Sequence, residues 1–257
     1  MARIITIFNQ KGGVGKTTTV INLAAALGKM NLRILIVDVD PQGNATSGLG
    51  IEKTQLKLST YDALINGVGL NEIIQKTSAE NVDIVPSNVE LAGSEIELIE
   101  MDNRELALKK AMEVIEDVYD YIFIDCPPSL GLLSINGLSA SHSVLIPIQC
   151  EYYALEGVSQ LVDTIMLVKR SLNPELEIEG VVLSMFDGRT NLSIQVVDEV
   201  KKYFKGKVYT SIIPRNVRLA EAPSHGLSIM DYDPKSRGAE AYGELAEEFL
   251  YLQEEEI

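Results

Sequence analysis

Short apolar runs alternate along this chain with longer segments in which apolar residues recur every three or four positions. The short runs are typical of strands buried on both faces, and the longer segments of helices with one face against a core. The expected strands are residues 4–8, 33–38, 82–86, 121–125, 143–148, 178–185 and 208–214. The expected helices are residues 20–30, 60–65, two between 96 and 115, 155–172, 194–203 and 238–252.

The order of these elements predicts the fold class. Strands alternate with helices throughout, which favours an α/β fold with one doubly wound, mostly parallel sheet and helices on both faces. We find no linker, no internal repeat and no low-complexity tract except a short acidic tail. Residues 1–257 are therefore predicted to form a single domain.

The stretch Gln-Lys-Gly-Gly-Val-Gly-Lys-Thr-Thr at residues 10–18 joins the first expected strand to the first expected helix. This geometry suits phosphate, because glycines let backbone N–H groups point at the anion and the helix N-terminus adds partial positive charge. We expect Lys16 to bind the β- and γ-phosphates and the Thr17 hydroxyl to bind Mg²⁺. The residues expected to hold the nucleotide phosphates are Lys11, Gly12, Gly13, Val14, Gly15, Lys16, Thr17 and Thr18.

One position departs from the usual G-x-x-x-x-G-K-[ST] pattern. Gln10 stands where the first glycine is expected, and a second lysine, Lys11, precedes two glycines. This form resembles the deviant Walker A motif of the ParA/MinD/nitrogenase-iron-protein group of ATPases. The resemblance implies that Lys11 reaches across a nucleotide sandwich dimer and that Gly12 lies where two such loops approach. The alternative is a glycine-rich turn with two solvated lysines.

Acidic residues follow two of the buried strands. Asp38 and Asp40 follow one of them, and Asp125 ends another in a Walker B pattern, at the sheet edge where α/β proteins bind ligands. Because Mg²⁺ keeps several water ligands, Asp38 and Asp125 are expected to act through its water shell. The run from residue 38 to 46 resembles the switch segment of the same ATPase group, which implies that Asp40 orients the attacking water. The alternative is a polar loop after a core strand.

These assignments predict a chemistry of positioning and charge neutralisation, with Lys11, Lys16 and Asp40 as the catalytic residues and ATP and Mg²⁺ as cofactors. Neither His142 nor His225 has an obvious metal partner in sequence, and both are interpreted as structural. Cys126 and Cys150 form no C-x-x-C and are expected to be buried thiols.

The composition limits which partners the protein is expected to bind and in which cell compartment it is expected. No apolar run is long enough to cross a membrane and no signal peptide is evident, so a cytoplasmic protein is expected. The net charge of −15, from 22 basic and 37 acidic residues, argues against a nucleic-acid footprint over the whole surface but permits a local basic patch. The acidic run Glu95, Glu97, Glu100 and Asp102 is interpreted as a solvated helix face.

Three features separate the branches of the ATPase group. A nitrogenase-type iron protein needs cluster-ligating cysteines that two cysteines cannot supply. A MinD-type protein ends in a basic amphipathic helix, whereas the tail here, 247–257, is acidic. Larger plasmid ParA proteins carry an additional N-terminal DNA-binding domain, whereas this chain begins at the first strand. The chain most closely resembles the short chromosomal ParA (Soj) branch, through the runs at 40–50, 125–133, 149–157, 213–226 and 232–240.

That resemblance implies a DNA-partitioning ATPase. Its ATP-dependent homodimer would bind double-stranded DNA nonspecifically on the nucleoid and leave it on hydrolysis, which a basic segment of a ParB-type centromere-binding partner would stimulate. Matched positions imply DNA binding by Arg189 and Arg218, with Lys235 and Arg237 secondary, and adenine contact by Pro214, Arg215 and Asn216. From the residues alone, the arginines are equally read as surface charges and Asn216 as a turn residue.

Two other functions remain to be distinguished. One is a MinD-like, membrane-associated positioning ATPase, which would bind anionic vesicles. The other is a metabolic P-loop enzyme, for which we find no dedicated substrate-binding segment.

Overall fold

The computed structural model describes residues 2–115, 117–151 and 157–255. Within these residues seven strands form one sheet in the order β3-β4-β2-β5-β1-β6-β7, parallel throughout except where β3 pairs antiparallel with β4. The strands are β1 (Arg3–Ile7), β2 (Ile34–Asp38), β3 (Gln75–Lys76), β4 (Val82–Val85), β5 (Tyr121–Asp125), β6 (Ser143–Gln149) and β7 (Glu177–Ser184). The predicted fold class, a mostly parallel sheet within an α/β protein, is confirmed.

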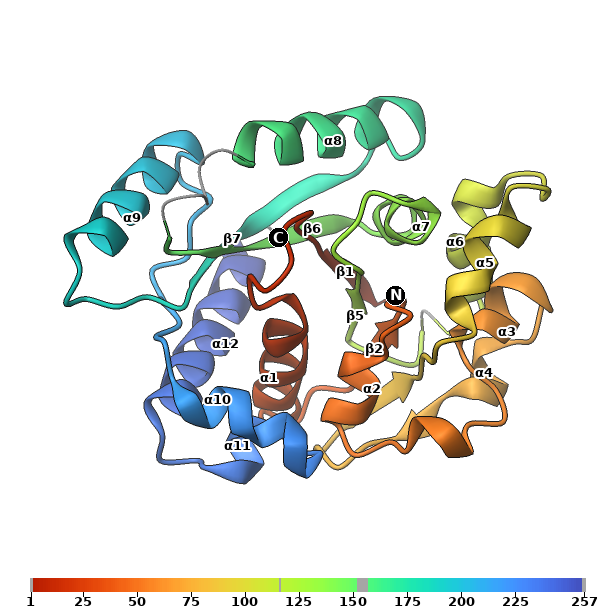
Figure 1. Ribbon diagram of the computed structural model, residues 1–257, viewed down its shortest axis with the longest axis horizontal. Coiled ribbons are helices and arrows are strands. Elements are labelled where there is room, and N and C mark those ends of the chain that lie inside the picture. The colour runs from red at the N-terminus through yellow and green to blue at the C-terminus, as the bar shows by residue number, and fades with distance from the viewer. Residues whose placement is uncertain (1, 116, 152–156, 256–257) are drawn as a thin grey trace.

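Helices lie on both faces of this sheet (Figure 1). The helices are α1 (Lys16–Lys29), α2 (Asn44–Gly48), α3 (Thr60–Ile65), α4 (Leu70–Ile73), α5 (Leu91–Leu98), α6 (Ala107–Met112), α7 (Leu132–Ala140), α8 (Val158–Ser171), α9 (Asn191–Tyr203), α10 (Val217–Glu221), α11 (Ile229–Tyr232) and α12 (Arg237–Glu255). Residue 155, the expected start of the helix before Ser171, lies outside the described residues.

Successive residues of the central strands belong to two separate apolar cores. Ile4 and Ile122 belong to the core under α3 to α9, whereas Ile5 and Phe123 belong to the core under α1 and α12. This arrangement explains why the strands read as continuous apolar runs: both faces of the sheet are covered. None of the described helices is both long and apolar enough to cross a bilayer.

Helix α12 has an apolar stripe that is used within the fold. Tyr242, Leu245 and Phe249 on this helix are fully or almost fully buried, and α12 packs against α1. The Tyr242 hydroxyl lies 3.2 Å from the Thr19 hydroxyl of α1. The helix is longer than the predicted residues 238–252, and its apolar face completes one core.

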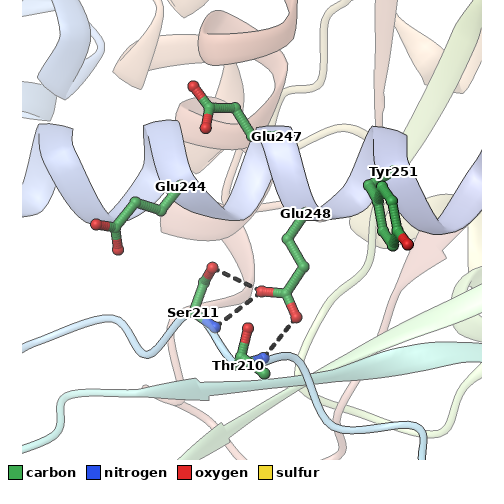
Figure 2. Close-up of a pocket in the computed structure, with 6 residues that line it drawn as sticks. All are labelled: Thr210, Ser211, Glu244, Glu247, Glu248 and Tyr251. Carbon is green, nitrogen blue, oxygen red and sulfur yellow. Dashed lines mark hydrogen bonds between the residues drawn. The ribbon is translucent and has the colours of Figure 1, made fainter.

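The predicted strand at 208–214 is wrong. The segment makes one bridge to β7, from Val208 to Val181, and one just beyond β7, from Pro214 to Phe186, but it is not a strand between them. Figure 2 shows the reason: the Glu248 carboxylate of α12 accepts hydrogen bonds from the Thr210 and Ser211 backbone N–H groups, at 2.6 and 2.8 Å. Because a side chain far along the sequence takes these donors, they are lost to a β-ladder.

The two histidines have the structural roles that were predicted. His142 accepts a hydrogen bond from the Ile4 backbone N–H through Nδ1, at 2.9 Å. The ring of His225 stacks on Tyr232. Both cysteines are buried free thiols, as expected.

Candidate functional site

The loop between β1 and α1 has a backbone that only glycine adopts readily. Gly13 and Gly15 have φ values of 73° and 91°, in the left-handed region. The loop is fixed from β7, because the Ser184 hydroxyl donates to the Val14 carbonyl at 2.8 Å. Helix α1 then begins at Lys16 without a side-chain cap, so its first N–H groups are suited to bind an anion.

The start of this loop is tied to β6 and α8. Asn9 donates to the Pro147 carbonyl and accepts from the Lys11 backbone N–H, at 2.8 and 3.0 Å. The Gln10 side-chain amide donates to the Thr164 hydroxyl of α8 at 2.8 Å. The usual phosphate loop has a glycine at the position of Gln10. Here the Gln10 side chain instead connects the loop to helix α8.

Lys16 lies within this loop and is only 7% exposed. Its ammonium donates to the Lys11 carbonyl at 3.1 Å. Burial lowers the pKa of Lys16, and the nearby carboxylates of Asp125 and Asp40 oppose that change. The structure thus brings Lys11, Lys16 and two of the predicted acidic residues to one edge of the sheet.

The strand register places Asp38 directly opposite Asp125, and Asp125 opposite Ile7 at the end of β1. Asp38 is fully buried and accepts from the Thr46 backbone N–H and hydroxyl at 2.9 and 2.7 Å. Burial raises the pKa of Asp38 to about 6, against the effect of these hydrogen bonds. The buried carboxyl is therefore held at a fixed place beside its neighbour on β5.

Asp40 is held from the loop after β4. Its carboxylate accepts from the Gln42 backbone N–H at 2.9 Å, and its own carbonyl accepts from the Ser87 hydroxyl at 2.8 Å. Ser87 also donates its backbone N–H to the Thr46 hydroxyl at 2.9 Å. Asp38 and Asp40 are therefore connected through Thr46 and Ser87 in one hydrogen-bonded network.

Asp125 differs from Asp38 and Asp40 in its hydrogen bonding. Its two carboxylate oxygens are buried and have no hydrogen-bond partner among the described residues. Its pKa is well above the ordinary value, first because of burial and then because of the charge of Asp38; Lys16 partly opposes this. The Thr17 hydroxyl also acts to lower the pKa of Asp125, although its contact falls outside hydrogen-bond geometry. A buried, unpaired carboxylate next to a lysine fits a cation that carries its own water ligands.

A metal cage made of side chains alone is not present in the described part of the chain: no three His, Cys, Asp or Glu side chains there are arranged to hold a metal ion. This agrees with the chemistry of Mg²⁺, which is usually bound by one or two carboxylates together with water and phosphate oxygens. The residues present therefore fit Mg²⁺ held jointly with a nucleotide.

The predicted DNA-binding residues lie outside this cluster, on exposed loops and helix ends. The side chain of Arg189 is 88% exposed and pairs with Asp187 at 2.7 Å. Arg218 on α10 pairs with Glu221 at 2.9 Å and with Asp233 at 3.5 Å. The two secondary candidates, Lys235 and Arg237, are exposed beyond α11. Both principal arginines already have carboxylate partners within the chain.

The segment predicted to contact adenine lies beside the end of β7. The Arg215 backbone N–H donates to the Phe186 carbonyl at 3.0 Å, next to the bridge that Phe186 forms with Pro214. The Arg215 guanidinium pairs with Glu151 at 2.7 Å. The Asn216 side-chain oxygen caps α10 by accepting from the Arg218 backbone N–H at 2.8 Å. In this structure Asn216 therefore acts as a capping residue, and its contact with a base stays a prediction.

This chain is similar to a known protein family and to named proteins. Residues 2–178 match a family model described as an AAA domain. The chain is 60% identical over 248 residues to the sporulation initiation inhibitor protein Soj of Bacillus subtilis, covering 96% of this chain and 98% of that protein. It is 54% identical to the chromosome partitioning protein ParA of Myxococcus xanthus, covering 97% of this chain and 88% of that protein. The chain belongs to the Soj/ParA family of chromosome-partitioning proteins.

A solved structure resembles this Soj/ParA chain over nearly its whole length. It is that of cobyrinic acid a,c-diamide synthase from Mycobacterium smegmatis with bound ADP and magnesium. Its TM-score is 0.87 at 37% identity, and the match covers 99% of this chain and 96% of that one. A nucleotide and magnesium are therefore accommodated by a relative with the same fold.

Several residues of this Soj/ParA site were not identified by sequence reasoning. Gln10 was noted only as a departure, Thr46 only as part of a loop, and Ser87 and Ser184 not at all. Ser184 reaches the site from the end of β7 and Ser87 from the loop after β4, and a single serine after an apolar run gives no local signal. They are found only once the strand order is known.

Proposed function

We propose that this chain is an ATP-hydrolysing DNA-partitioning protein whose ATP-bound homodimer binds DNA nonspecifically. The observation that supports it most directly is the buried, unpaired Asp125 carboxylate beside Lys16 and the glycine loop. Such an arrangement costs stability unless a charged ligand completes it. Membership of the Soj/ParA family makes a nucleoside triphosphate with Mg²⁺ the best-supported ligand.

In this proposal, the backbone N–H groups of residues 12–17 surround the phosphates and Lys16 exchanges its bond to the Lys11 carbonyl for a β- or γ-phosphate oxygen. The Thr17 hydroxyl would hold Mg²⁺, and Asp38 and Asp125 would bind the water ligands of the ion. When bound, Mg²⁺ neutralises charge on the phosphates. Pro214, Arg215 and Asn216 form one wall for the base.

Asp40 would orient the water that attacks the γ-phosphate. Its backbone is held by Ser87 and its carboxylate by the Gln42 N–H, so the group is positioned before any ligand arrives. Lys11 would complete the site of the partner protomer, which makes hydrolysis depend on dimerisation.

The open space beside Gly12 supports the proposed dimer. A Cβ placed on Gly12 would meet only Pro128, at an ordinary 3.8 Å, and the residue is absent from the positive-φ glycines. Gly13 and Gly15, in contrast, need glycine for their backbone conformation. Since nothing within the protomer requires a glycine at position 12, we infer that the space beside it serves the nucleotide or a second copy of the chain.

A dimer would also resolve the conflict between a net charge of −15 and DNA binding. Two protomers present two copies each of Arg189 and Arg218, and if each neutralises one phosphate, log K against log salt should have a slope of roughly −4. The acidic remainder of the surface would attract the basic segment of a ParB-type partner that stimulates hydrolysis.

The two alternative functions have less support. A MinD-like membrane helix needs a free apolar face, whereas the apolar face of α12 is buried against α1. A metabolic enzyme needs a substrate site next to the phosphate loop. A cavity of about 870 Å³ between α3 and α6 is lined by none of the loop residues 10–18, and a cavity that Lys11 and Val14 do line has a volume of only about 20 Å³.

Light scattering after size exclusion, with ADP or ATP and with or without DNA, tests the proposal on three proteins. Asp40→Ala should form a stable ATP dimer that retains DNA, because binding is kept and hydrolysis is removed. Gly12→Val should bind ATP and remain a monomer, since the new side chain fits its own protomer but obstructs the partner. A dimeric Gly12→Val protein, or an Asp40→Ala protein that hydrolyses ATP like the unmodified chain, would contradict these assignments.

A further inference from the structure

Thr46 is a fully buried polar residue in the first turn of α2. The helix begins after Gly43, which has no side chain to cap it, and the Thr46 backbone N–H donates to Asp38 Oδ2 at 2.9 Å instead. A carboxylate from the end of β2 thus caps this helix from outside it. The backbone contact needs no particular side chain at position 46, so the threonine there calls for a separate reason.

The Thr46 hydroxyl is used in both directions. It accepts a hydrogen bond from the Ser87 backbone N–H at 2.9 Å. Because an N–H group can only donate, the hydroxyl keeps its own proton for Asp38 Oδ2, at 2.7 Å. Ser87 is fully buried in the loop after β4, and β4 is the neighbour of β2 in the sheet. One side-chain oxygen therefore joins the ends of two strands.

Both partners of this hydroxyl also bind Asp40. Asp38 Oδ1 accepts from the Asp40 backbone N–H at 3.1 Å, and the Ser87 hydroxyl donates to the Asp40 carbonyl at 2.8 Å. The contacts form a closed ring of four residues, each 6% exposed or less: Thr46, Asp38, Asp40 and Ser87. Because the ring holds the backbone of Asp40 on both sides of its Cα atom, it sets the point from which the Asp40 carboxylate extends.

The loop after Asp40 is also packed against the backbone of Ser87. Gly43 has a φ of 57°, and a Cβ placed on it would lie 2.7 Å from the Ser87 carbonyl oxygen, a backbone atom that cannot move without the loop after β4. The Gly43 N–H donates to the Asp40 carbonyl at 2.8 Å. The loop from Asp40 to Gly43 therefore rests on a surface that the ring holds in place.

We propose that Thr46 is a positioning residue for ATP hydrolysis, because its hydroxyl closes the ring that places the Asp40 carboxylate. It acts through Asp38 and Ser87 rather than on the nucleotide itself. Such fixed placement raises the rate of a reaction without strengthening the binding of the substrate, since the reacting groups need no further ordering. This role rests on the proposed ATP hydrolysis.

Thr46→Val keeps the shape of the side chain and removes the hydroxyl. It should lower kcat for ATP about tenfold and leave KM for ATP unchanged, because placement rather than binding is lost. Thr46→Ser retains the hydroxyl and should restore kcat to within about twofold of the unmodified chain. Ser94→Ala is the control, because it removes another fully buried hydroxyl, which donates to the Leu91 carbonyl within α5 at 2.7 Å, and it should leave kcat unchanged.

Ser87→Ala opens the ring on its other side. The Asp40 carbonyl still accepts from the Gly43 N–H, and the Ser87 N–H still reaches the Thr46 hydroxyl, so both buried groups keep a partner. This variant therefore also serves where Thr46→Val proves too unstable to purify. It should lower kcat about fivefold, and combining it with Thr46→Val should lower kcat no further, since the ring is then already open.

Three kinetic results would overturn the role of Thr46. The first is a kcat within about twofold of the unmodified chain in Thr46→Val or in Ser87→Ala. The second is a loss in Thr46→Ser as large as that in Thr46→Val. The third is a double variant in which the two losses multiply, because the residues then act independently.

Amide hydrogen exchange in the nucleotide-free protein separates this role from the proposed function. The Gln42 and Gly43 N–H groups both donate to Asp40, at 2.9 and 2.8 Å. Both should exchange about tenfold faster in Thr46→Val and in Ser87→Ala but not in the control. If the unmodified chain hydrolyses no ATP, the proposed function fails and the role fails with it, whatever the exchange rates. If hydrolysis is present and the exchange of these two amides does not change, the Thr46 role alone fails.

Discussion

The nucleotide edge and the arginine loops hold their charges in opposite ways. Lys16, Asp38 and Asp125 are buried, and strands far apart in sequence fix their positions. Arg189 and Arg218 are exposed and pair with acids two or three residues away. Exposed pairs contribute little to stability, whereas buried charges are set by the whole fold. The chemistry of the nucleotide edge can thus be inferred from the structure of one protomer. The role of Arg189 and Arg218 depends on which ligand replaces Asp187 and Glu221 as their partners.

The largest effect is expected from removing the buried cation. Lys16→Ala should weaken ATP binding by at least about 100-fold, because the loop loses its charge-assisted contact with the phosphates. Titration with a fluorescent ATP analogue measures the affinity. Lys11→Ala is the matched control and should keep the ATP affinity of the monomer, since Lys11 is assigned to the nucleotide of the partner protomer. Equal losses of affinity in the monomer would show that both lysines of one protomer contact the same nucleotide.

A smaller effect, on stability, is expected from neutralising the unpaired carboxylate. Burial holds the folded-state pKa values of Asp38 and Asp125 above the value of about 3.9 for an unfolded chain. The folded protein therefore binds these protons more tightly, and ionisation costs stability as pH rises above about 4, up to about 6 for Asp38 and further for Asp125. Asp125→Asn should raise Tm by about 5 °C at pH 7.5.

That gain should shrink as the pH falls towards the unfolded-state pKa of about 3.9, because the folded and the unfolded chain then both bind the proton, and ATP hydrolysis should be lost across this pH range. Differential scanning calorimetry without nucleotide measures the difference. The exposed residue Asp102 provides the control, because Asp102→Asn should leave Tm unchanged. A Tm gain that does not depend on pH would exclude ionisation as its cause.

The smallest effect concerns the exposed arginines. Arg189→Ala with Arg218→Ala should reduce DNA affinity of the ATP dimer about tenfold at low salt and bring the salt slope from roughly −4 towards zero. Filter retention at several salt concentrations measures both. Arg170→Ala with Lys201→Ala makes the same charge change on α8 and α9 and should change little. An unchanged slope in the first variant would place the DNA surface elsewhere.

The local acids provide a sharper form of this test. Arg189 donates hydrogen bonds to Asp187 and holds the pKa of that carboxyl at about 2, so the pair persists at neutral pH and competes with phosphate. Asp187→Asn should therefore raise DNA affinity about twofold. A loss of affinity would mean that Asp187 orients Arg189 for DNA.

The nucleotide edge could be predicted because its signals are local. A glycine loop between an apolar run and a helix, and acids at the ends of apolar runs, place Lys16, Asp38 and Asp125 together once the sheet is parallel. Ser87 and Ser184 could not be placed, because a single serine after an apolar run gives no local signal until the strand order is known. The 208–214 segment failed for a similar reason: Glu248, which takes its N–H groups, lies about 40 residues away.

The position of β1 in the sheet has a consequence for synthesis of the chain. β1 lies between β5 and β6, with Arg3 beside Tyr121 and Ile5 beside Ser143. β1 therefore has no neighbouring strand until about half of the chain, up to Asp125 of 257 residues, has emerged from the ribosome, and such long-range pairings form slowly. The phosphate loop, although encoded among the first twenty residues, cannot acquire its shape on a nascent chain before β5 and β6 are made. Nucleotide binding should thus begin only late in translation, when the rest of the site can also form.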